Sequence, residues 1–219
     1  MKRLRLRNFN WKYIVGEVLL IFVGINLAIW FNDWNASKKI DQDKKIAIEK
    51  IQIEIKNNLG ELRKTRQNNQ RLVKAIETYK GFDSGDEDGV VVTAGQMGKF
   101  QKEFPDFLRI TDSTNIADAL FNYEGDVFIN LELAELSKIA WETSKTTGIV
   151  NEFNYDCLYG LQGIYNLQDL VMKEMDKASN ALQNQEIELL LRVLDFIRQM
   201  DSSLEKEYEA FLKRITDCI

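Results

Sequence analysis

The sequence predicts an all-α protein, in which an N-terminal transmembrane helix continues into a long juxtamembrane helix and then into an antiparallel helical bundle. Three observations predict this fold class. An apolar run near the N-terminus is long enough to cross a bilayer. Apolar residues recur at steps of three and four through much of the remaining chain. Only one proline and twelve glycines occur among 219 residues, so long segments contain no strong helix breaker.

The predicted transmembrane helix occupies residues 13–34 and follows a basic tail at residues 1–12. Its run from Tyr13 to Phe31 is apolar except for Glu17 and Asn26 and covers about 28 Å at about 1.5 Å per residue, close to the hydrocarbon thickness of a bilayer. A cleaved signal peptide would end in small residues, whereas Asn32, Asp33 and Trp34 follow here. We therefore expect an uncleaved anchor, with aromatic residues at both membrane interfaces: Trp11, Tyr13, Trp30 and Trp34.

The orientation of the span follows from basic residues. Five lysines and arginines precede it with no acidic residue among them, although a comparable number of lysines follows it. Those before the span lie closer to it, and large domains cross membranes largely regardless of charge. The sequence therefore favours a cytoplasmic N-terminus, with the soluble domain on the other side.

Glu17, Gly24 and Ala28 form a candidate association face within the span. They lie at i, i+7 and i+11, which places them on one stripe of a helix. Gly24 and Ala28 have the spacing of small residues that lets two membrane helices approach closely. The alternative is that Glu17 extends towards the headgroups and that Gly24 and Ala28 are ordinary membrane-helix residues. The sequence does not decide between these interpretations.

The soluble part is predicted to begin with a long juxtamembrane helix at residues 35–80. Its apolar periodicity is interrupted in phase by Asn58, Thr65 and Asn69, which favours packing within a bundle or a register-setting role. Residues 81–219 are predicted to complete the bundle, with helical pieces near 116–123, 131–146 and 152–182 and a last helix that follows a turn near 183–184.

An acidic, glycine-rich loop is expected at residues 81–95, with a short strand in its second half at 90–93. Aligned with an EF-hand, Asp86 and Asp88 occupy the third and fifth ligand positions, but Gly95 occupies the twelfth, where a bidentate glutamate is needed. We therefore expect no calcium site, no other metal and no cofactor.

The chain contains no histidine, which removes the commonest general base and metal ligand and argues against an enzyme. A net charge of −5, with acidic and basic residues interspersed, argues against a nucleic-acid partner held by a basic face. Cys157 and Cys218 are expected to stay reduced, because straight helices on either side of the predicted turn would offset them by roughly 12 Å.

The stretch GEVLLIFVGINLAIWFNDWN resembles the opening of a bacterial family of unknown function, in which Gly-Glu-(Ile/Val) enters an apolar span and Asn-x-Trp-Asn leaves it. The later AWETSKTTGIVNEFNYDCLYGLQGIYNLQ is similar to that family's Ala-Trp-Glu segment. The segment INLAIWFND departs from the family's more aliphatic run. The resemblance implies an envelope-anchored helical protein without catalytic residues, and it depends on these positions: Gly16, Glu17, Trp34, Asn35, Trp141 and Glu142.

The function that these features favour is a non-enzymatic, membrane-anchored interaction module in the bacterial inner membrane. It would serve as an accessory or scaffold subunit of an envelope complex or form a homo-oligomer, so its partners are the bilayer and either copies of itself or other membrane subunits. Two alternatives remain open: a transport, pore or motor component with Glu17 in an ion path, and a tethered ligand-sensing domain.

Overall fold

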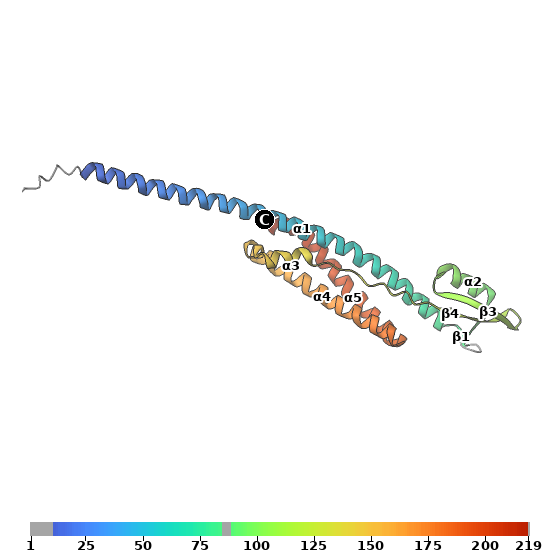
Figure 1. The fold of residues 1–219 in the computed structure, drawn as a ribbon. Helices are drawn as coiled ribbons and strands as arrows, with labels where there is room; N and C mark the ends of the chain where they lie inside the picture. Colours follow the sequence, from blue (N-terminus) through green and yellow to red (C-terminus); the bar gives the residue numbers. More distant parts are fainter. Residues whose placement is uncertain (1–10, 85–88, 219) are drawn as a thin grey trace, which may run out of the picture.

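The computed structural model describes residues 11–84 and 89–218, and its dominant element is the single helix α1, Trp11–Lys80. This helix of 70 residues passes without a break through the expected end of the span at residue 34. Its first part projects alone, and its second part packs on the rest of the chain (Figure 1). The basic tail at residues 1–10 and the loop residues Asp86 and Asp88 lie outside the described residues.

By length and composition α1 contains a segment that could span a membrane, and no residue of that apolar window is buried by the described part of the chain. A soluble core helix would bury such a segment because apolar surface is driven out of water. The result fits a single-pass membrane protein.

The bundle consists of the second part of α1 together with α4, Tyr155–Gln183, and α5, Ile187–Arg214. Glu54 of α1 bonds to Tyr165 in the first half of α4, whereas Lys80 at the end of α1 pairs with Glu188 at the start of α5. The helix α4 therefore runs parallel to α1, and α5 runs back towards the projecting part of α1. The predicted helical bundle and the turn between the last two helices are present.

A small antiparallel sheet at the far end of α1 corrects the all-α prediction (Figure 1). The strand order is β1-β2-β4-β3, in which β1 has only two residues. The helix α2 leads from β2 towards β3 and begins with a capping box at Thr93 and Gln96. The short strand expected at residues 90–93 is β2. The bounds are β1, Asp83–Ser84; β2, Val90–Thr93; α2, Ala94–Glu103; β3, Leu108–Ala117; β4, Leu120–Val127.

The helix expected near residues 116–123 is wrong because this stretch turns back on itself as a β3–β4 hairpin. The loop has two residues, and Ala119 takes a φ of 63° there, although glycine or asparagine is usual at such a position. The strand β4 also needs Gly125, because a Cβ atom would lie 2.4 Å from the carbonyl oxygen of Arg109 on the paired strand.

The helix expected at residues 131–146 forms only in its second half, as α3, Ile139–Thr146. Residues 128–138 instead run as an extended segment along the bundle, back from the sheet towards the projecting part of α1 (Figure 1). Two short 3₁₀ helices complete the chain: η1, Ile149–Glu152, and η2, Ile215–Cys218.

Cys157 and Cys218 form a disulfide with a Cα–Cα distance of 5.3 Å, so the expectation of a reduced pair is wrong. That expectation assumed a tight turn and straight helices. The connection between α4 and α5 instead spans Asn184 to Glu186, which shortens the offset. The last residues leave α5 as η2, which contacts α4. The bridge closes the bundle at the end nearest the projecting part of α1.

The disulfide yields a stability prediction. We expect the Cys157→Ser/Cys218→Ser double variant to lose about 2–4 kcal/mol of unfolding free energy, since the bond restricts the unfolded chain. The two cysteines are separated by 61 residues, so the loop that opens is long. Urea unfolding of the detergent-solubilised chain, followed by circular dichroism, measures the loss. A reductant should shift the wild type to the variant's curve, and a wild type that does not respond to reductant would contradict the bridge.

Candidate functional site

The predicted association residues Glu17, Gly24 and Ala28 are all exposed on the projecting part of α1. A Cβ atom added at Gly24 would meet no other atom within 4 Å, so this side of the helix is open to a close neighbour. The structure thus leaves the predicted face uncovered within the described chain.

The predicted interface anchors are exposed as well, as interfacial aromatic residues must be to contact lipid. Trp11 and Tyr13 are 68% and 71% exposed. At the other end of the span, the rings of Trp30 and Trp34 stack at 6.4 Å, and the ammonium of Lys38 lies 3.8 Å from the centre of the Trp34 ring. Such pairs of aromatic and basic residues suit the boundary between lipid and water.

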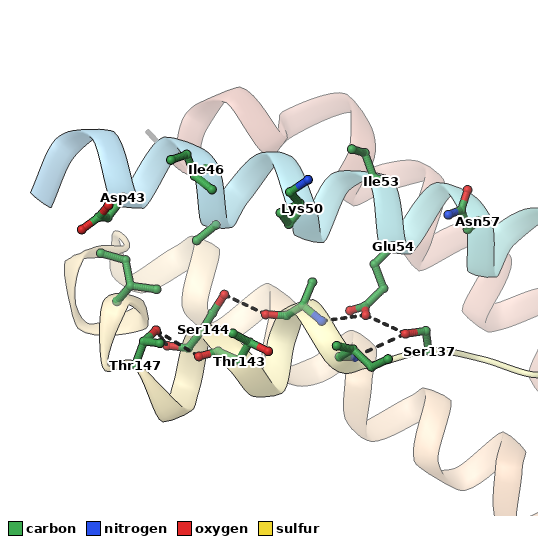
Figure 2. Close-up of a pocket in the computed structure, with 14 residues that line it drawn as sticks. Asp43, Ile46, Lys50, Ile53, Glu54, Asn57, Ser137, Thr143, Ser144 and Thr147 are labelled. Carbon is green, nitrogen blue, oxygen red and sulfur yellow. Dashed lines mark hydrogen bonds between the residues drawn. The ribbon is translucent and has the colours of Figure 1, made fainter. Parts of the chain in front are cut away.

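An apolar groove lies between α1 and α3, close to the place where α1 leaves the bundle (Figure 2). Its volume is about 710 Å³. Three isoleucines on its rim are far more exposed than core residues: Ile46 at 47%, Ile53 at 44% and Ile139 at 75%. Large apolar side chains gathered around a groove are typical of a surface that binds something.

Ile46 and Ile53, the two groove isoleucines of α1, lie on the same side of that helix as the predicted association face. Eighteen residues make about five turns of an α-helix, so positions 18 apart are in phase. Ala28 and Ile46 are 18 apart, as are Asn35 and Ile53, and Glu17 lies a further 18 before Asn35. The helix is unbroken throughout. We call these in-phase residues the outer face: Glu17, Gly24, Ala28, Asn35, Gln42, Ile46 and Ile53.

The opposite side of α1 is the one that packs on the bundle. Ile51, Ile55 and Leu62 are buried and lie roughly 160–180° around the helix from Ile53. The second part of α1 therefore has a buried face and an uncovered apolar face. The sequence did not predict this uncovered face, because Ile46 and Ile53 lie outside the main apolar periodicity of the helix. Their spacing of 18 residues from Ala28 and 36 residues from Glu17 is the signal that could have predicted it.

The floor of the groove is built around Glu54, whose carboxylate points from α1 towards the start of α3 (Figure 2). One oxygen accepts from the Ser137 hydroxyl and the Ala140 amide, both at 2.8 Å. The other accepts from the Tyr165 hydroxyl at 2.6 Å and the Trp141 amide at 3.3 Å. Since Lys138 supplies no side-chain cap to α3, Glu54 caps that helix from a neighbouring one.

Asn58 and Asn69 hold the extended segment that precedes α3. Each side chain bonds to both main-chain groups of one residue: Asn58 to Ser137 at 2.6 and 2.8 Å, and Asn69 to Glu132 at 2.8 and 3.0 Å. Asn58 and Asn69 are eleven residues apart on a helix, and Glu132 and Ser137 are five residues apart in an extended segment. Both separations cover about 16 Å, so each asparagine reaches its partner. We call Glu54, Asn58 and Asn69 the polar row of α1.

The polar row continues into a buried network. Gln168 accepts from Asn58 at 3.3 Å and from the Tyr208 hydroxyl at 2.7 Å, and it donates to the carbonyl of Leu136 at 3.0 Å. Trp141 stacks on Tyr165 with ring centres 5.3 Å apart. Burial, together with the bond to Glu54, raises the pKa of Tyr165 well above its usual value, so Tyr165 remains a hydrogen-bond donor.

Asp201 is a second buried carboxyl group, and its surroundings differ from those of Glu54. It is 1% exposed, and its Oδ1 has no hydrogen-bond partner within the described residues. It lines a cleft of about 330 Å³ between α1 and α5. Burial raises its pKa to about 7, Arg66 opposes the shift and Glu205 adds to it.

Comparison of the chain with protein-family models, curated proteins and solved structures finds no match. The resemblance stated for the entry and exit of the span therefore stays a prediction. Of its residues, Trp141 is buried in α3, where its amide bonds to Glu54, while Gly16, Glu17, Trp34 and Asn35 lie exposed on α1.

Replacing the carboxylate of Glu54 tests how much the polar row contributes to stability. We expect Glu54→Gln to lose about 2–3 kcal/mol of unfolding free energy, because an amide has one acceptor oxygen and its NH₂ group would face donors. Thermal or urea unfolding of the full chain in detergent measures the loss. Glu77→Gln, an exposed change on the same helix, should stay within about 0.5 kcal/mol of wild type. Equal behaviour of both variants would show that the row contributes little.

The raised pKa of Asp201 makes a pH prediction. The folded state holds this proton more tightly than the unfolded chain, so the contribution of Asp201 to stability is lost as pH rises from about 4 to about 7. Asp201→Asn cannot ionise, and above pH 7 we expect it to exceed wild type by on the order of 2 kcal/mol. Unfolding measured at several pH values checks the difference between the two proteins.

Asp195→Asn is the matched control, because Asp195 is an exposed residue of the same helix. It removes an exposed ion pair with Arg198, so its unfolding free energy should stay within about 0.5 kcal/mol of wild type. A constant difference between Asp201→Asn and wild type from pH 4 to 8 would show that Asp201 does not titrate near neutrality.

Proposed function

We propose that this protein is a single-pass, membrane-anchored interaction module without enzymatic activity. Residues 13–34 cross the membrane, and α1 carries the bundle and the sheet on the same continuous helix. The outer face of α1 binds a helix of another membrane-spanning chain, which leaves the membrane beside α1 and enters the groove next to α3. The protein thereby acts as an accessory or scaffold subunit or as a homo-oligomer.

The observation that carries the proposal is the continuity of the outer face. Its in-phase positions extend from Glu17 to Ile53, about 54 Å along one unbroken helix. Within the described chain it is uncovered from end to end: small residues lie on the part inside the span, and half-exposed isoleucines lie on the part beside the bundle. A second helix that follows this face would be apolar in the membrane and also in the groove.

The disulfide supports a position for the soluble domain outside the cytoplasm. Disulfides persist in oxidising compartments, and the bacterial periplasm is one of them. A cytoplasmic N-terminus with a periplasmic bundle is also the arrangement that the basic residues before the span favour. We therefore propose a bacterial inner-membrane location with the Cys157–Cys218 bridge in the periplasm.

Enlarging a small residue on the outer face tests the proposal. We expect Gly24→Leu to dissociate the complex that the wild-type chain forms after gentle detergent extraction, because a leucine keeps two helices from close approach. Native mass spectrometry of the tagged full-length protein reads out the complex.

Gly16→Leu is the matched control, since Gly16 is equally open but lies about 100° away from the outer face. A wild-type chain that is always monomeric and alone, or equal effects of the two glycine variants, would contradict the proposal. Glu17→Gln should leave the complex intact. Loss of ion flux in this variant without loss of assembly would instead favour an ion path through Glu17.

A further inference from the structure

We infer that the helix bound by the outer face is α1 of a second copy of this chain, related to the first by a two-fold axis parallel to the helices. This inference rests on the proposed function and identifies its partner. It is carried by the charges that flank the outer face beside the groove, together with the residues within the face.

At the level of the groove each flank carries one acidic and one basic residue, and the two flanks carry them in opposite order along the helix. At 100° per residue, Lys50 and Asp43 lie about 60° and 80° to one side of Ile53, while Glu49 and Lys45 lie about 40° and 80° to the other. All four are exposed, and within residues 11–84 and 89–218 none of them forms an ion pair.

A parallel two-fold axis brings unlike flanks together. It turns one helix by half a revolution, so the Lys50 side of one copy faces the Glu49 side of the other. Because the two helices are parallel and in register, residues with similar numbers lie at similar positions along the axis. Lys50 then meets the partner's Glu49, and Asp43 meets the partner's Lys45. Each contact occurs twice, which gives four opposite-charge pairs beside the apolar contact.

The residues within the outer face also suit a copy of themselves. In a two-fold dimer each residue on the axis meets its own counterpart, so Gly24 and Ala28 allow close approach and Ile46 and Ile53 pack on their equivalents. Glu17 also meets the partner's Glu17, and the two carboxyl groups separate by extending towards the headgroups, about one turn away. Asn35 meets the partner's Asn35. A single asparagine pair of this kind favours a two-stranded parallel arrangement in fixed register.

The groove gives the second helix room on the α3 side. Its volume of about 710 Å³, beside Ile46, Ile53 and Lys50, leaves space for the partner's flank that carries Glu49 and Lys45. Nearer the membrane, Lys38 and Lys39 lie on opposite flanks and meet like charges. These residues are at headgroup level, where anionic lipid neutralises lysine. The attraction that selects the second copy is therefore at the level of the groove.

Cysteine cross-linking of the full-length protein in lipid nanodiscs tests the geometry. We expect Ile53→Cys to form a disulfide-linked dimer under mild oxidation, since this residue meets its counterpart. Ile40→Cys is the matched control, because Ile40 is 40% exposed on the same helix but lies about 140° from Ile53. The control should stay monomeric on a non-reducing gel.

Exchange of charges tests the flanks. Lys50→Glu or Glu49→Lys alone should weaken dimerisation about tenfold, because each creates two like-charge contacts. The double variant, which carries both changes, should restore the wild-type dissociation constant. The same pair of exchanges at Lys206 and Glu207, exposed on α5, should have no effect. Dimer dissociation is measured by dilution in detergent and mass photometry.

The outcomes separate this inference from the proposed function. A complex with a different membrane protein that Gly24→Leu dissolves, and that contains one copy of this chain, would overturn the second-copy partner and leave the proposed function standing. A chain that is monomeric throughout would overturn both. A homodimer that neither cross-links at Ile53→Cys nor responds to the charge exchanges would show that the copies meet through another surface.

Discussion

The arrangement of this protein depends on the hydrogen bonds of the polar row. Glu54, Asn58 and Asn69 fix the extended segment to α1 through main-chain groups that an isolated strand could not otherwise satisfy. Because the segment is fixed, α3 begins at a defined point and receives its cap from Glu54. The groove follows from this, since α3 is its second wall. Loss of the row would therefore remove the groove as well as stability.

The row also explains why polar residues interrupt the buried periodicity of α1. A buried asparagine is costly unless its amide is paired. Asn58 and Asn69 are each paired twice with the main chain of a single residue. Thr65, the third interruption, has no partner for its hydroxyl within the described residues. The first two positions thus determine where the extended segment lies, whereas nothing in the structure explains the third.

The sequence predicted the elements that depend on neighbouring residues and missed those that depend on residues far apart in the chain. The apolar N-terminal helix, its continuation through residue 80 and the α4–α5 pair follow from local apolar periodicity, and as helices these predictions agree with the structure. The β3–β4 hairpin was missed because its loop contains no glycine and its apolar residues also fit a helical spacing. The extended segment and the disulfide were missed because each depends on residues far apart in the chain.

The candidate site shows the same division. Glu17, Gly24 and Ala28 could be selected from spacing alone, because all three lie on one short stretch of helix. The groove could not be predicted from spacing, since α3 is held beside α1 by contacts between residues more than 80 positions apart. Ile46 and Ile53 became meaningful only when the structure showed that α1 is unbroken and that their side of the helix is uncovered.

The base of the bundle is the part best suited to present a binding surface. Two separate constraints lie there: the Cys157–Cys218 bond and the Glu54 carboxylate. Farther along the bundle, the ion pairs of Arg63 and Arg66 with Glu205 join α1 to α5. A surface held in place in this way loses little conformational entropy when a partner binds, so more of the contact energy appears as affinity. Beyond Gly60 the same side of α1 carries the exposed residues Lys64 and Arg71, which end the apolar face. The outer face therefore stops within the bundle and leaves the sheet outside the contact.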